Sequence, residues 1–142
     1  MRSLTGRIEP KGPFLFVTAM QTTQYVERAK AAGITPTAPM NVRALVDTGA
    51  SSSALDATVI QSLNLIQTGR TQVHTPSGYG ERDQFDVSLF FGSVPGDVKS
   101  FTVSIISSDL ASEGFLAILG WDILRHCILT CDGPKGTFRL DY

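Results

Sequence analysis

The spacing of apolar residues along the chain is mainly that of β-strands. Residues 14–20 are rich in β-branched and aromatic side chains and predict a strand. Phe85, Val87 and Leu89 alternate with polar residues, so they predict a strand with one buried face. Residues 115–119 are all apolar and predict a strand buried on both faces. Further strands are expected at residues 42–46, 71–75, 101–106, 127–130 and 137–142.

Helical spacing is limited to short segments. Residues 24–32 could form a turn or two of helix, with Gly33 stopping it. Residues 56–63 have helical spacing with Asp56 placed to cap the first turn, and residues 121–126 fit another short helix. About eight short, closely spaced strands with two short helices favour an all-β sandwich or barrel.

Glycine-rich turns separate the expected strands. A turn at residues 76–80 joins two of them into a long hairpin, and a second turn is expected at Gly96 and Asp97. A third turn, at residues 132–136, predicts a closing hairpin at the end of the chain.

Composition narrows the function classes without naming one. The 142 residues correspond to one domain, and 42% hydrophobic with 18% charged residues is ordinary globular composition. The formal net charge of −1 gives no electrostatic footprint for nucleic acid or a membrane surface. Neither a signal-peptide pattern nor a membrane-spanning apolar run is present, so we expect a cytoplasmic protein.

The tripeptide Asp47-Thr48-Gly49 is the strongest candidate for chemistry. An apolar strand delivers Asp47 to its very end, and a turn of small residues follows at once. Aspartate is depleted in strands, so an acid in this place suggests a carboxylate held at the edge of the core. The alternative is a turn aspartate that accepts backbone N–H bonds, and local sequence does not separate the two interpretations.

Two motifs carry a resemblance to a known family. Residues 44–52, Ala-Leu-Val-Asp-Thr-Gly-Ala-Ser-Ser, are similar to the signature of aspartic peptidases. Residues 117–124, Ala-Ile-Leu-Gly-Trp-Asp-Ile-Leu, are similar to the Ile-Leu-Gly-x-Asp-x-Leu stretch of retropepsin-like domains. The glycine-rich hairpin occupies the position of the family's flap. The resemblance covers residues 12–142 and implies an all-β, closed acid-protease-type barrel or sandwich with a flap hairpin, one or two short helices and one lobe per chain.

The resemblance also implies an assembly. Only one Asp-Thr-Gly occurs in the chain, whereas the family's chemistry uses two carboxylates, so a homodimer is implied in which each subunit supplies Asp47. Thr48 would hydrogen-bond across the dimer axis, and Gly49 would let the backbone approach the carboxylates.

The implied activity is that of an aspartic endopeptidase that uses a water nucleophile, with no metal and no cofactor. Its substrate would be an extended polypeptide segment with apolar residues flanking the bond, and Tyr79 at the flap tip would touch it. The implied substrate-binding residues are Ala50, Ser51, Ser52, Ser77, Gly78 and Tyr79.

The sequence departs from the retroviral pattern at two positions. Retroviral proteases often pair an Asp after Asp-Thr-Gly-Ala with an Arg after the second glycine, but here Ser51 and Trp121 take these places. Because both partners are missing together, no unpaired buried charge results. The subunit contact is therefore open, and residues 21–39, longer than the retroviral counterpart, could carry a different one.

Other reactive side chains are interpreted as structural. Cys127 and Cys131 lie too close in sequence for a disulfide framework and read as small half-buried hydrophobes. His74 and His126 have no metal-ligand spacing. Trp121 is expected to pack and Asp122 to cap the short helix or bond nearby backbone. Residues 51–53 lack the Gly-x-Ser-x-Gly context of a serine nucleophile.

Two alternatives stay open at this level. The same fold could bind an extended peptide or simply dimerise without cutting it, because a fold does not establish activity. The domain is expected at residues 12–142, with residues 1–11 as an N-terminal extension, and the chain could be a complete small protein or a domain of a larger one.

Overall fold

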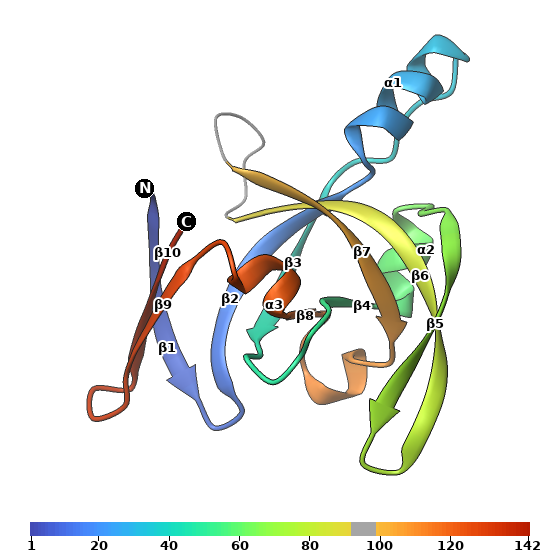
Figure 1. The fold of residues 1–142 in the computed structure, drawn as a ribbon. Coiled ribbons are helices and arrows are strands. Elements are labelled where there is room, and N and C mark those ends of the chain that lie inside the picture. The colour runs from blue at the N-terminus through green and yellow to red at the C-terminus, as the bar shows by residue number, and fades with distance from the viewer. Residues whose placement is uncertain (92–98) are drawn as a thin grey trace.

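The computed structural model describes residues 1–91 and 99–142, apart from the side chain of Thr75, and is mostly β (Figure 1). The turn expected at Gly96 and Asp97 lies outside the described residues. The structure has the predicted all-β fold with one lobe in the chain. Its described part holds three short α-helices and one 3₁₀ turn, more helix than the one or two predicted.

Six strands close into a barrel. β6 pairs with β7 on one side and with β2 on the other, where Val17 lies opposite Phe91. The pairing of β6 with β2 closes the run of strands from β6 to β2 into a ring. The barrel strands in spatial order are β6 (Gly78–Phe91), β7 (Ser100–Ser108), β4 (Ala54–Asp56), β8 (Ala117–Leu119), β3 (Met40–Val46) and β2 (Gly12–Met20).

Apolar side chains fill the barrel at the positions that alternation predicts. Val87 and Leu89 of β6 are buried, and Phe85 packs partly buried against the same core. β8 is shorter than the strand predicted at residues 115–119, and only one of its faces is fully buried: Ala117 and Leu119 are inaccessible, whereas Ile118 is half-buried. The interior is therefore a packed core, and the candidate site lies where strands leave it.

The β5–β6 hairpin extends out of the barrel. β5 (Gln67–Thr75) begins four residues earlier than expected, and its pairing with β6 runs to Thr75 opposite Gly78. The turn is therefore Pro76 and Ser77 alone, which is tighter than the predicted turn at residues 76–80. Gly78 has a φ of 117°, a backbone conformation that side-chain-bearing residues rarely adopt.

A three-stranded antiparallel ribbon flanks the barrel. It consists of β1 (Ser3–Glu9), β10 (Thr137–Asp141) and β9 (Ile128–Asp132), and the last two form the predicted closing hairpin. The residues predicted as an extension thus supply a strand that pairs with β10 and continues into β2. A hydrogen bond from Ser3 Oγ lowers the pKa of the Asp141 carboxyl, which ties the two ends of the chain together.

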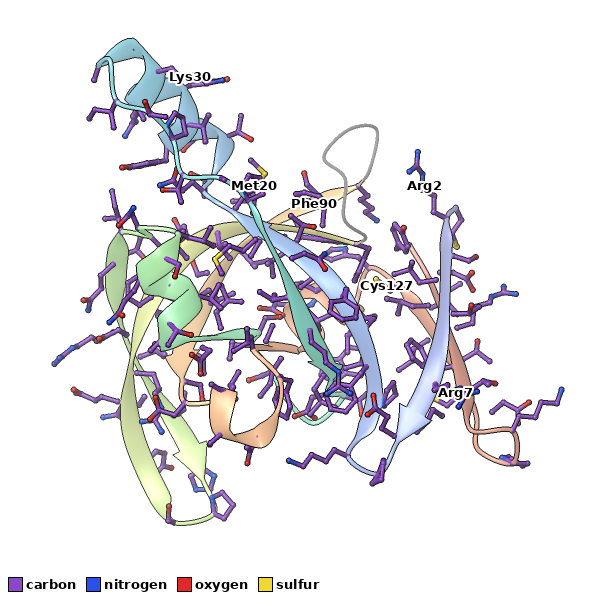
Figure 2. The ribbon with its side chains drawn as sticks, turned by 180° about the vertical axis from the view of Figure 1, so that it is seen from behind. Arg2, Arg7, Met20, Lys30, Phe90 and Cys127 are labelled. Carbon is purple, nitrogen blue, oxygen red and sulfur yellow. The ribbon has the colours of Figure 1, made fainter. Side chains whose placement is uncertain are left out.

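The helices are short and begin at recognisable caps. α1 (Thr23–Ala31) starts where the Tyr25 N–H donates to Thr22 Oγ1 at 3.3 Å, and it projects from the end of the barrel opposite the hairpin tip (Figures 1 and 2). In Figure 2, Lys30 marks this projecting end. The remaining helices are α2 (Ala57–Ser62), α3 (Trp121–Leu124) and the 3₁₀ turn η1 (Ala111–Glu113).

Candidate active site

Two parallel neighbouring strands deliver the two sequence motifs to one place. β3 and β8 pair in parallel, with Val46 beside Leu119. Asp47 follows β3 directly, and its N–H donates to the Leu119 carbonyl at 3.0 Å. Gly120 follows β8. Because parallel strands end at the same edge of the sheet, residues 73 positions apart in the chain meet here.

The Asp47 carboxylate is held by its own turn. The Gly49 N–H donates to Asp47 Oδ1 at 2.9 Å, and the Ala50 N–H donates to the Asp47 carbonyl at 3.2 Å. Asp47 is half-buried, while Thr48 and Gly49 are exposed. This backbone bond fits a turn aspartate, and the half-buried side chain also fits a carboxylate held at the edge of the core, so it does not separate the two interpretations. In either case, the single chain presents a fixed, accessible carboxylate.

Gly120 permits a close crossing of two backbone segments. A Cβ at this position would lie 2.7 Å from the Ala50 carbonyl oxygen and 2.9 Å from that of Ser52. The Trp121 N–H donates to the same Ala50 carbonyl at 2.9 Å. The second motif therefore buttresses the turn after Asp47, and this contact requires glycine.

A buried serine and an aspartate lock the two motifs together. Ser53 is fully buried, and its N–H and Oγ donate to the two carboxylate oxygens of Asp122 at 2.8 and 2.6 Å. The Gly120 N–H donates to Ser53 Oγ at 3.0 Å. The structural role expected for Asp122 is thus present, but sequence reasoning missed Ser53 as its partner.

Trp121 lies against the Asp-Thr-Gly turn. Its indole Nε1–H donates to the Thr48 carbonyl at 2.6 Å, and the residue is 45% exposed. It was expected to be a packing residue, but the indole N–H also fixes the orientation of the Thr48 peptide. Trp121 occupies the position at which retroviral proteases often have the arginine of their charged pair.

Asp56 stabilises the segment that runs beside the site. Its carboxylate accepts N–H bonds from Thr58, Leu110 and Ala111 at 3.0, 2.7 and 2.9 Å, and a 2.5 Å bond from Thr58 Oγ1. Burial raises the pKa of this carboxyl, but the hydrogen bonds outweigh burial and lower it to about 2. The predicted cap of α2 therefore also anchors η1.

The hairpin and the Asp-Thr-Gly turn lie at the same end of the molecule. Both views place the η1 segment between the hairpin and the loop after β3 (Figures 1 and 2). Tyr79 at the tip is 77% exposed, and its ring lies 4.9 Å from that of His74 on β5. His74 was not among the residues predicted for the site, and nothing in its sequence spacing pointed to this contact.

A family comparison decides the kind of protein. The model of a family described as aspartyl protease matches residues 29–123, which is more than half of the chain. The chain belongs to the aspartyl protease family. The matched region of this aspartyl protease contains the first motif, the second motif up to Ile123 and the β5–β6 hairpin.

One solved structure agrees with the family at the level of the fold. A retropepsin-like aspartic protease from Rickettsia conorii is similar to this chain with a TM-score of 0.59 and 17% identity, over 99% of this chain and 91% of that one. The retroviral protease-like domain of Ddi1 from Leishmania major gives a TM-score of 0.43 at 17% identity, over 86% and 83% of the two chains. No curated protein matches.

The two cysteines of this aspartyl protease differ in burial: Cys127 is half-buried as expected, whereas Cys131 is exposed, so the expectation of a half-buried side chain is wrong for Cys131. Cys127 and Cys131 are free thiols, and burial raises the pKa of the half-buried Cys127. Within residues 1–91 and 99–142, no three His, Cys, Asp or Glu side chains are grouped to hold a metal ion. In the same ranges, no helix has the length and apolar character needed to cross a membrane.

Proposed function

We propose that the protein is an aspartic endopeptidase that acts as a homodimer, with Asp47 of each subunit forming the catalytic pair. The observation that carries the proposal is the position of Asp47. It lies at the end of a buried strand, in a turn held by Gly49 and Gly120, with its carboxylate accessible. Membership of the aspartyl protease family supports this assignment.

The chemistry follows from bringing two such carboxylates together. Two carboxylates about 3 Å apart do not both ionise readily, so they share one proton and titrate as a unit. The ionised member removes a proton from a water molecule held between them. The protonated member polarises the scissile carbonyl and then donates its proton to the leaving amine. The pH dependence of kcat/KM is therefore expected to be bell-shaped on the acidic side.

The accessibility of the Asp-Thr-Gly turn supports the dimer. Thr48 and Gly49 are exposed in the single chain although they adjoin a fully buried strand end. A second copy related by a two-fold axis would cover this turn and bring the two Asp47 side chains together. Thr48 would then hydrogen-bond to its mate and stiffen the pair.

The β5–β6 hairpin is proposed as the flap. An extended peptide would bind between this hairpin and the turn after β3 through main-chain hydrogen bonds, as strands add to sheets. Ser77, Gly78 and Tyr79 at the tip would close over it, and Ala50, Ser51 and Ser52 would line the floor. Closure would exclude water other than the nucleophile.

The test is peptide cleavage by matched variants. Wild type, Asp47→Asn and Asp86→Asn are incubated with a mixed peptide library across about pH 3 to 8, and products are identified by mass spectrometry. Asp86 is an exposed aspartate on β6 and serves as the control. We expect cutting by wild type and the control, and a loss of at least about a thousandfold in Asp47→Asn.

The result that would overturn the proposal is also defined. A folded wild-type protein, shown by sedimentation to be dimeric, that cuts no peptide at any pH would point instead to a peptide-binding module. Equal cutting by wild type and Asp47→Asn would assign the activity to a contaminant.

A further inference from the structure

The inner face of the β5–β6 hairpin is polar. This differs from what a substrate with apolar residues on both sides of the cleaved bond, as expected from the sequence, would need. Along β6, Phe85 and Val87 point into the core, and alternation places Asp83 and Glu81 on the same side of the strand. Their partners across the hairpin are Arg70 and Gln72. The side of the hairpin that faces the barrel end therefore carries charges.

A hollow separates this face from the end of β7. It has a volume of about 460 Å³, which is large enough for a long side chain. One wall consists of Arg70, Glu81, Arg82 and Asp83, and the other of residues 107–109. Those residues lead directly into η1, which lies between the hairpin and the loop after β3 (Figure 1).

The charges in the hollow are unevenly paired. Arg70 is neutralised by Glu81 and Asp83, at 3.4 and 3.1 Å. Arg82 donates to the main-chain carbonyl of Glu81 at 3.0 Å, and no ion pair within the described residues involves Arg82 or Asp109. Three carboxylates against two guanidinium groups leave the hollow with a formal net charge of −1.

The wall that carries Asp109 is fixed in place. The buried Asp56 carboxylate accepts the N–H groups of Leu110 and Ala111, the two residues that follow Asp109. The main chain next to Asp109 is therefore held before any ligand arrives, which lowers the cost of binding.

We propose that this hollow is a substrate subsite that prefers a lysine or arginine side chain, with Asp109 favouring that preference and Arg82 opposing it. The proposal rests on the endopeptidase function proposed above. The apolar stem of a basic side chain can lie along the hairpin while its head group reaches Asp109. An apolar side chain would displace water from these polar groups without replacing its hydrogen bonds.

The test compares peptides that differ at one position. Cleavable peptides carry Lys, Gln, Glu or Leu in turn at each position near the cut, and kcat/KM is measured at about pH 5.5, where ordinary carboxyl groups are ionised. At one position, wild type is expected to prefer Lys over Leu. The Lys/Leu ratio should fall about three- to fivefold in Asp109→Asn and rise by a similar factor in Arg82→Gln.

A matched control removes a charge outside the hollow. Asp86 lies on β6 but is not among the residues that line this hollow, and its carboxylate accepts a hydrogen bond from Ser104 Oγ on β7, so Asp86→Asn should leave the Lys/Leu ratio unchanged. Equal Lys/Leu ratios of kcat/KM in wild type, Asp109→Asn and Arg82→Gln would overturn the proposed subsite. If all three proteins still cut peptides, that result would leave the proposed endopeptidase function unaffected.

Binding separates the subsite from catalysis. The same peptides, labelled with fluorescein, are titrated against Asp47→Asn alone and combined with Asp109→Asn or Arg82→Gln, and anisotropy gives the affinity. A Lys preference that shifts in the two expected directions would support the subsite even if no protein cut a peptide. No preference in binding or in cutting would overturn it.

Discussion

At the scale of single residues, Gly120 makes the tightest backbone contact of the candidate site. A methyl group there would lie 2.7 Å from the Ala50 carbonyl oxygen, well inside van der Waals contact. Gly120→Ala must therefore displace the turn that carries Asp47, and we expect peptidase activity to fall at least about a hundredfold. Steady-state cleavage measures the effect on activity, and urea denaturation should show destabilisation of about 2 kcal/mol.

A second glycine supplies the control. A Cβ on Gly133, in the β9–β10 turn, would have nothing within 4 Å, so Gly133→Ala should be nearly neutral in both assays. Activity in Gly120→Ala equal to that of Gly133→Ala would contradict the buttressing role of the second motif.

Only some residues of the site could be predicted from the sequence. Asp47 and Gly120 could be predicted because each follows an apolar strand within a recognisable motif. The Ser53–Asp122 lock could not, because its partners are 69 residues apart and neither stands out among neighbouring serines and aspartates. The indole bond from Trp121 to Thr48 was equally invisible, since it depends on a side-chain orientation that only the packed structure defines.

At the scale of elements, Asp56 couples the start of α2 to η1. The folded-state pKa of its carboxyl is about 2, below the ordinary value of 3.8, so ionised Asp56 stabilises the folded state above about pH 4. This stabilisation is lost as the pH falls from about 4 towards 2. The shift corresponds to about 2 kcal/mol. Asp56→Asn should therefore destabilise the protein by about this amount at pH 7 and by much less near pH 2.

Urea denaturation at fixed protein concentration measures this difference. Asp86→Asn, which removes an exposed carboxylate, should show no comparable pH-dependent gap from wild type. A gap between Asp56→Asn and wild type that stays constant from pH 7 to about pH 2 would mean that the Asp56 charge does not supply the stabilisation.

Elements with a regular apolar pattern were predicted, and those without one were not. The strands around Phe16, Val87 and Ile118 follow from alternation or from continuous apolar runs. β4 was missed because its three residues follow a small-residue turn and pair only with strands distant in sequence. The hairpin turn was placed too wide because Gly78 and Gly80 read as turn residues, whereas both pair with β5.

At the scale of the whole molecule, the apolar pattern of the strands did not show which strands close the barrel. Closed barrels and open sandwiches share the same strand pattern, and the choice depends here on β2 pairing with the far end of β6. The pairing of β1 with β10 is of the same kind, because it joins opposite ends of the chain. The family resemblance implied a closed barrel or sandwich, but strand register between distant segments came only from the structure.

The proposed dimer can be followed with a natural probe, because Trp121 is the chain's single tryptophan and contacts the Asp-Thr-Gly turn. It is 45% exposed in the single chain, so burial by a second copy would remove water from the indole. We expect its emission to shift to shorter wavelength as protein concentration rises, with the same midpoint as the rise in peptidase activity per chain. Trp121→Phe serves as the blank for this signal.

The location of the subunit contact decides whether the Trp121 emission changes with protein concentration. If the turn lies at the interface, dilution must change emission, activity and sedimentation together, because one equilibrium governs all three. If sedimentation shows dimers forming while the emission stays constant, the contact lies away from Trp121, and α1, which projects from the opposite end of the barrel, becomes the surface to test (Figure 1). A contact through α1 would leave the two Asp47 carboxylates apart, so the shared-proton mechanism requires the first outcome.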